Sequence, residues 1–197
     1  MLKTPLPRSF YLRPTLLVAP DLLGRCLVRR YRNTLLAGTI VEVEAYLGRR
    51  DPASHSYRGK TERNSVMFGT GGHLYVYFTY GMHFCCNVVT EEEGNGCAVL
   101  IRALEPLEGL PVMRKLRGAP AAGDDRLLTN GPAKLCQAFG IGRADNGADL
   151  AGDRIYLTRG TPVAGRAVVT SPRIGISEGK EFPFRFYIRG NRFVSRP

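Results

Sequence analysis

The chain has 197 residues, of which 44% are hydrophobic, so it is long enough to bury one substantial core. Lys and Arg number 28 against 17 Asp and Glu, and the resulting net charge of +11 favours a polyanionic partner. The early apolar run Leu16–Ala19 is too short for a signal peptide or a membrane span, so we expect a cytosolic protein. The five cysteines lack metal-ligand spacing and indicate reduced, buried thiols, with no zinc site and no disulfide framework.

The first predicted elements are two strands, Arg25–Tyr31 and Leu35–Tyr46, joined by a short polar turn. Leu74–Tyr80 and Met82–Thr90 form a second predicted hairpin around Gly81. Strands with such short connections favour antiparallel pairing.

A near-continuous apolar run follows at Cys97–Leu104 and predicts a strand covered on both faces, in the middle of a sheet. The later predicted elements are two helices and two strands: Pro111–Arg117, Pro132–Phe139, Ala167–Thr170 and Phe184–Ile188. We therefore expect one α+β domain over residues 1–197, with an antiparallel-rich sheet, few helices and a protruding β-hairpin.

The strand before Tyr46 carries the first candidate chemistry. Its alternation assigns one face to Thr39, Val41, Val43 and Ala45, and the other to Ile40, Glu42, Glu44 and Tyr46. We expect the first face to be core. The second is either a solvated face or a site that uses its carboxylates.

Arg102 lies within the apolar run of the predicted central strand, where a guanidinium needs a carboxylate or the solvent of a cleft. If its partner is Glu44, the pair can hold an ionised carboxylate beside an ordered water, as a general base requires. A structural ion pair explains Arg102 equally well.

Tyr80, Met82 and His83 surround Gly81 at the predicted hairpin tip. A large aromatic residue at a turn of a basic protein indicates a wedge that enters a base stack. His55 lies in a basic loop with Arg63, where an imidazole can stack on a base or donate to it. Lys134 follows a helix start at Pro132 that could bind a phosphate.

Five long strings together carry a resemblance to a known family. They are VEVEAYLG (41–48), AxHSYRGKTxRN (53–64), LYVYFTYGMHFCCN (74–87), LIRALEPLEG (100–109) and GPAKLCQA (131–138). The chain resembles the alkyladenine, or 3-methyladenine, DNA glycosylase family over Leu22 to Ser195, and the motifs occur in one order. His83 departs from the tyrosine of some members.

The resemblance implies a role for each matching residue. Glu44 would activate water, with Arg102 and the main chain at Ile174 ordering that water. The implied walls around a flipped base are Tyr46, His55 and Tyr77, with Asn87 as a gate on the pocket floor. The resemblance also implies that Tyr80 fills the vacated stack, and from the hairpin, the basic loop and the helix start we further expect Met82, His83, Arg63 and Lys134 to contact DNA.

The resemblance further implies a DNA repair enzyme that excises alkylated or deaminated purines, such as 3-methyladenine, hypoxanthine or ethenoadenine, from double-stranded DNA. No lysine stands out as a Schiff-base nucleophile, so we expect a monofunctional enzyme that leaves an abasic site. We expect no metal, no cofactor and no membrane association. We also expect a monomer in the cytoplasm, associated with a bacterial nucleoid through DNA binding.

Two other classes of function remain open at this point. A non-catalytic nucleic-acid-binding module explains the charge and the aromatics, but not a carboxylate such as Glu44 in a basic cleft. A carbohydrate hydrolase could use Glu42 and Glu44 as paired acids, although the net charge suits a sugar poorly. If Glu44 is the base, we expect Glu42→Gln to be mild beside Glu44→Gln.

Overall fold

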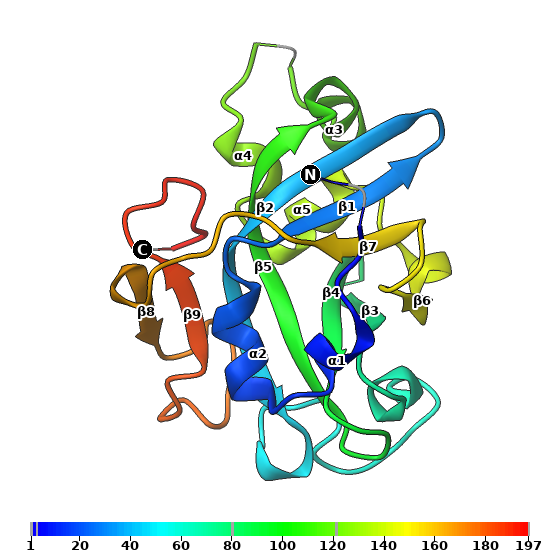
Figure 1. Ribbon diagram of the computed structural model, residues 1–197, viewed down its shortest axis with the longest axis vertical. Coiled ribbons are helices and arrows are strands. Elements are labelled where there is room, and N and C mark those ends of the chain that lie inside the picture. Colours follow the sequence, from blue (N-terminus) through cyan, green and yellow to red (C-terminus); the bar gives the residue numbers. More distant parts are fainter. Residues whose placement is uncertain (1, 3, 80, 121, 197) are drawn as a thin grey trace.

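The computed structural model describes residues 2, 4–79, 81–120 and 122–196 (Figure 1). An antiparallel sheet of nine strands organises this part of the chain. Its strands are β1 (Cys26–Tyr31), β2 (Thr34–Leu47), β3 (His73–Thr79), β4 (His83–Thr90), β5 (Cys97–Glu108), β6 (Ala148–Asp149), β7 (Ile155–Thr158), β8 (Val168–Ser171) and β9 (Arg185–Ile188). Seven of them follow the order β6-β3-β4-β5-β2-β1-β7, while β9 pairs with β2 and β8.

The two longest strands, β2 and β5, lie side by side at the centre of the sheet (Figure 1). Cys97–Leu104 of β5 is buried throughout, which confirms the predicted central strand. Apolar groups on both faces of a strand are stabilised when other elements cover both faces. The predicted α+β class with an antiparallel sheet is confirmed.

The strict alternation predicted for β2 is wrong at Val41. The pairing with β5 shifts register on both sides of Glu42: Val41 is an extra residue in β2, and Arg102 is an extra residue in β5. Val43 and Ala45 join the main core, whereas Val41 packs in a separate cluster with Ala103 and the C-terminal segment. A bulge of this kind reassigns faces that a period of two cannot predict.

Five helices cover the sheet in the described chain. They are α1 (Arg8–Tyr11), α2 (Thr15–Leu22), α3 (Leu110–Arg117), α4 (Arg126–Thr129) and α5 (Pro132–Ala138). The predicted helices correspond to α3 and α5, and α5 has Pro132 in its first turn, as expected. The sequence patterns did not predict α2, which contains Pro20, a residue that usually ends a helix. No helix within the described ranges is both long and apolar enough to cross a membrane.

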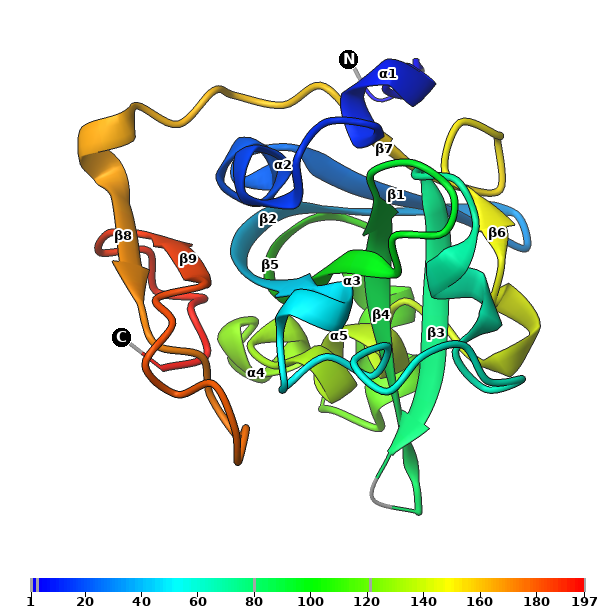
Figure 2. The ribbon, with the colours of Figure 1, turned by 90° about the horizontal axis from the view of Figure 1, so that it is seen from below.

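The β3–β4 hairpin extends beyond the body of the molecule, as predicted (Figure 2). Tyr75 of β3 pairs with Asn87 of β4, and Tyr77 pairs with Cys85, so these four side chains form one patch of a sheet face. Asn87 and Leu100 pair in turn across β4 and β5. This ladder forms the floor of the site described next.

Candidate active site

A cavity of about 810 Å³ lies where several segments of the chain meet. The residues that line it include Tyr46, His55, Tyr75, Tyr77, Cys85, Asn87, Leu100, Arg102, Ile174 and Arg196. They come from the end of β2, the loop after it, the strands β3 to β5 and the segments that flank β9. The structure thus brings together six of the predicted site residues, which are separated by up to 128 positions between Tyr46 and Ile174 (174 minus 46).

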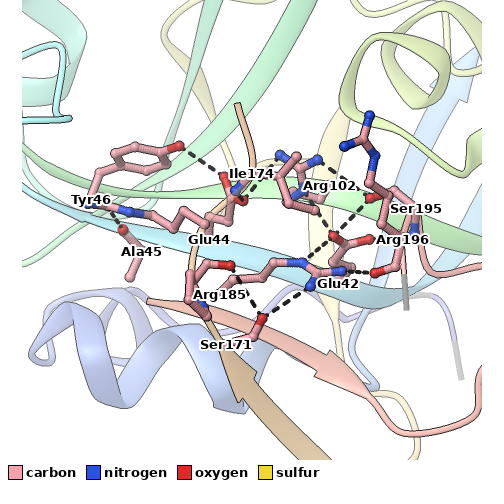
Figure 3. A network of polar contacts seen from close by, with 12 residues as sticks. Glu42, Glu44, Ala45, Tyr46, Arg102, Ser171, Ile174, Arg185, Ser195 and Arg196 are labelled. Carbon is pink, nitrogen blue, oxygen red and sulfur yellow. Dashed lines mark hydrogen bonds and ion pairs between the residues drawn. The ribbon is translucent and has the colours of Figure 1, made fainter. Parts of the chain in front are cut away.

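Glu44 lies directly behind the wall of this cavity and its side chain has no solvent exposure. Its Oε2 accepts a hydrogen bond from the Tyr46 hydroxyl at 2.9 Å, and its Oε1 accepts one from the Ile174 amide at 2.7 Å. An Arg102 nitrogen lies 3.2 Å from the same Oε1 (Figure 3). All three partners line the cavity, and together they fix the orientation of the Glu44 carboxylate.

Arg102 joins Glu44 to the second carboxylate of the strand. Its Nε donates to Oε1 of Glu42 at 2.9 Å (Figure 3). Glu42 is fully buried and also accepts from Arg185 Nε at 2.8 Å and from both the amide and the hydroxyl of Ser195. Burial lowers the pKa of Arg102, but the charges of Glu44 and Glu42 outweigh it and raise that pKa overall. A solvated face at Glu42 and Glu44, one of the two readings of this strand, is therefore wrong.

Aromatic rings form the walls of the cavity beside the charged groups of Glu44 and Arg102. His55 and Tyr77 meet edge to face with centroids 4.5 Å apart, and Tyr75 stacks against Tyr77 at 5.6 Å. Burial raises the pKa of Tyr77 and of Tyr46, and for Tyr46 the Glu44 charge adds to this effect. Burial likewise raises the pKa of Tyr75 to about 12. These phenols are neutral donors at any physiological pH.

His55 faces the cavity and its ring remains accessible to solvent. Partial desolvation lowers its pKa, and the positive charge of Arg63 lowers it further. Its Nδ1 lies 3.2 Å from the Tyr75 hydroxyl, which holds the ring against the sheet. A lone histidine in a loop often has no functional role, but His55 forms a wall of the cavity. Its imidazole is neutral at pH 7.

Asn87 lies on the cavity floor with 5% of its surface exposed. Its Nδ2 donates to the Tyr75 carbonyl at 3.3 Å across the β3–β4 ladder. This bond fixes the amide against the strand, as a strand-stabilising role requires, and the gate stays a prediction.

The structure describes all but one of the residues predicted to contact DNA: Met82, His83 and Arg63 lie on or against the β3–β4 hairpin, and Lys134 lies in α5. Met82 is 70% exposed beside the hairpin turn, and His83 pairs with Thr79 at the first position of β4. Arg63 donates to the Phe78 carbonyl at 3.1 Å, and Lys134 donates to Asn130 at 2.8 Å. The exception is Tyr80, which lies outside the described residues, so its predicted role stays a sequence-based prediction.

Sequence reasoning missed a buried ion pair between Arg173 and Asp51. The two terminal guanidinium nitrogens of Arg173, NH1 and NH2, contact the Asp51 carboxylate at 2.5 and 2.8 Å, and neither side chain is exposed. Asp51 lies in a polar loop and Arg173 directly before Ile174, and 122 positions separate them. The string SPRIG around Ile174 could have indicated this ion pair, because a guanidinium directly beside a site residue needs a partner when it is buried.

Comparison with known proteins agrees with this geometry. The sequence pattern of the family described as "Methylpurine-DNA glycosylase (MPG)" matches residues 9–192. A protein of Carboxydothermus hydrogenoformans is 55% identical over 192 residues, which cover 97% of this chain and 98% of the relative. A Burkholderia lata protein is 53% identical, with 98% and 91% covered, and a Methanoculleus marisnigri protein is 51% identical, with 97% and 98% covered.

All three relatives carry the name "Putative 3-methyladenine DNA glycosylase". The family pattern covers most of the chain. The three relatives align with the chain almost end to end, and each is more than 50% identical to it. The family predicted from the sequence motifs is confirmed: the chain belongs to the methylpurine-DNA glycosylase family and is a DNA repair glycosylase.

Proposed function

We propose that this protein flips an alkylated or deaminated purine out of double-stranded DNA into the aromatic cavity and hydrolyses its N-glycosidic bond. The observation that carries the proposal is the Glu44–Arg102 pair, buried directly behind an aromatic-walled cavity of a protein with net charge +11. A carboxylate beside a DNA-binding cavity weakens phosphate binding, so its presence indicates a chemical role, and its pairing with a neighbouring cation suits activation of water.

Glu44 has the capacity to hold that water. An ionised carboxylate offers about four acceptor positions. Among the described residues, Ile174 and Arg102 occupy Oε1, and Tyr46 occupies one position of Oε2. The remaining position on Oε2 is where we place the water, which attacks C1′ of the deoxyribose as its proton passes to Glu44. The purine leaves, and an abasic site remains.

The walls favour a purine that already carries positive charge. Tyr46, Tyr77 and the neutral His55 present aromatic faces and edges to the cavity, and aromatic faces attract cations. A protonated His55 would repel an alkylated, cationic purine, so its lowered pKa suits this class of substrate. Hypoxanthine is neutral and must gain a proton as it leaves, from an acid or solvent that we do not assign.

Neither alternative class of function fits the contacts as well. Glu42 does not line the cavity and is held by Arg102, Arg185 and Ser195, which suits a structural role better than that of the second acid of a carbohydrate hydrolase. A non-catalytic binding module would not need a buried carboxylate joined to a cavity-lining arginine, because burial of that pair is costly.

The proposal is tested with duplexes that carry a single 3-methyladenine, hypoxanthine or ethenoadenine. We expect the protein to convert these positions to abasic sites, detected by alkaline cleavage of the strand. A duplex without a lesion is the control, and strand breaks before alkali would reveal a lyase activity that we do not expect. Tight lesion binding without any excision would favour the binding module instead.

Shortening Asn87 to Ser is expected to relax discrimination against guanine. Guanine differs from hypoxanthine only by its 2-amino group, and the fixed Asn87 amide excludes that group by steric clash. Leaving such a donor unpaired costs roughly 1 to 3 kcal/mol, so discrimination should fall by about ten- to a hundredfold. Excision of guanine opposite thymine measures the effect, with hypoxanthine excision as the control. A stable, active variant that rejects guanine as well as the parent does would contradict the gate.

Met82→Ala is expected to weaken DNA binding without lowering the melting temperature. Met82 is 70% exposed beside the hairpin turn, so truncating it removes little packing from the folded protein. An exposed apolar side chain there can pack against an opened base step. Fluorescence anisotropy with a lesion duplex measures the affinity, and Leu107→Ala, 49% exposed at the end of β5, is the control. A marked loss of thermal stability would show that Met82 belongs to the packing of the hairpin.

A further inference from the structure

The Arg173–Asp51 ion pair lies just outside the cavity and contacts three of its walls. The pair is a two-point contact between side chains without solvent exposure, and neither residue lines the cavity. Planar, bidentate pairing of this kind holds a guanidinium in one orientation. The fixed guanidinium can therefore fix the position of the groups that it contacts, which are the Ala45 carbonyl and the Tyr46 ring.

Arg173 contacts the two residues that follow Glu44 in β2, and it directly precedes Ile174. Its NH1 donates to the Ala45 carbonyl at 2.9 Å, between Glu44 and Tyr46 in β2. Its guanidinium lies over the Tyr46 ring, 4.7 Å from the centroid. The next residue along the chain, Ile174, donates its amide to Glu44 at 2.7 Å. One side chain thus places two of the three groups that surround the Glu44 carboxylate.

Asp51 extends the same connection to the loop that carries His55. Its oxygens accept from the Leu47 amide at 3.2 Å and from the Ala53 amide at 3.1 Å. Arg173 NH2 also donates to the Gly179 carbonyl at 3.4 Å, so the segment after Ile174 contacts the ion pair as well. The ion pair therefore joins the end of β2, the His55 loop and the Ile174 segment.

We infer that Arg173 and Asp51 are positioning residues for the Glu44 base: their ion pair sets the Ile174 amide and the Tyr46 ring against its carboxylate. The inference rests on the proposed role of Glu44. Two buried charges are a poor means of stabilising a fold, since apolar residues of similar size often do as well. A device that fixes orientation, in contrast, needs the directional contacts that this pair has.

The inference is tested by removing both charges together with Arg173→Gln/Asp51→Asn, because removing one charge alone leaves the other buried and unpaired. The matched control is Arg29→Gln/Asp145→Asn, which removes another buried pair, 2.8 Å apart and away from the cavity. Each protein is assayed by single-turnover excision of ethenoadenine from a duplex, with the rate referred to folded protein.

We expect the Arg173/Asp51 variant to excise at least about tenfold more slowly than the parent, since a misplacement of about 1 Å can cost up to a hundredfold. The control variant should lose stability and keep its rate. Arg173→Lys keeps the charge without the two-point contact, so it should fall between the two. If the double variant does not fold, Arg173→Lys decides, and a parental rate there overturns the inference.

A second measurement separates positioning of the base from general damage. In a Glu44→Gln background, with all of the duplex bound, the Arg173/Asp51 substitutions should change the residual excision rate by no more than about threefold, because there is no base left to position. A further large loss in that background, or a parental rate with Glu44 present, overturns the inference while the proposed function stands. Normal excision by Glu44→Gln alone would instead refute the base itself, and the inference with it.

Discussion

Glu44→Gln is expected to keep lesion binding and to lose excision by about a hundredfold or more, because an amide cannot take a proton from water. The substitution is nearly isosteric and the site can accept it. The amide oxygen can accept from the Ile174 amide and Arg102, while the Tyr46 hydroxyl can rotate to accept from the new NH2 group. The folded structure should therefore survive the change.

Single-turnover excision of hypoxanthine and of ethenoadenine, with binding measured on the same duplexes, tests this result. The matched control is Glu108→Gln, an exposed carboxylate at the end of β5 that does not line the cavity. It should excise at the parental rate. Near-normal turnover by Glu44→Gln would rule out Glu44 as the base.

Glu42→Gln is expected to destabilise the protein by about 3 kcal/mol, near the low end of the cost of breaking a buried ion pair. The sequence predicts only that excision by Glu42→Gln is less impaired than excision by Glu44→Gln, and the structure adds this expected loss of stability. Glu42 holds Arg102 and Arg185 within 2.9 Å in a site without exposure, and Arg185 pairs with no other carboxylate among the described residues. A neutral amide would leave that buried guanidinium without a counter-charge.

Thermal unfolding measures the effect, with an expected fall of about 6 to 12 °C for a chain of this size. Excision should decline less than in Glu44→Gln, because Arg102 keeps its contact with Glu44. Glu105→Gln, on the partner strand β5, is the control: its partly exposed carboxylate accepts one bond from Asn191. An unchanged melting temperature in Glu42→Gln would show that the Arg102 and Arg185 charges find other compensation.

Much of the fold was predictable because its signals are local. The hairpin around Gly81 and the apolar run of β5 both depend on neighbours along the chain. The short helix α2 was not predictable in this way. It contains Pro20, and its buried residues pack against β2 and β5, so tertiary contacts override a local stop signal. The bulge at Val41 has the same origin in strand pairing.

The sequence by itself determined the family, the basic charge and six of the residues that line the cavity, because long motifs keep residue types in a fixed order. Only the tertiary structure decided which of them touch. Glu42 and Glu44 alternate in one strand, yet both are buried and share Arg102 from the neighbouring strand. Ile174 reaches Glu44 across 130 positions, and Arg173 reaches Asp51 across 122. Contacts at such separation depend on how strands and loops pack, and local sequence patterns carry no information on that packing.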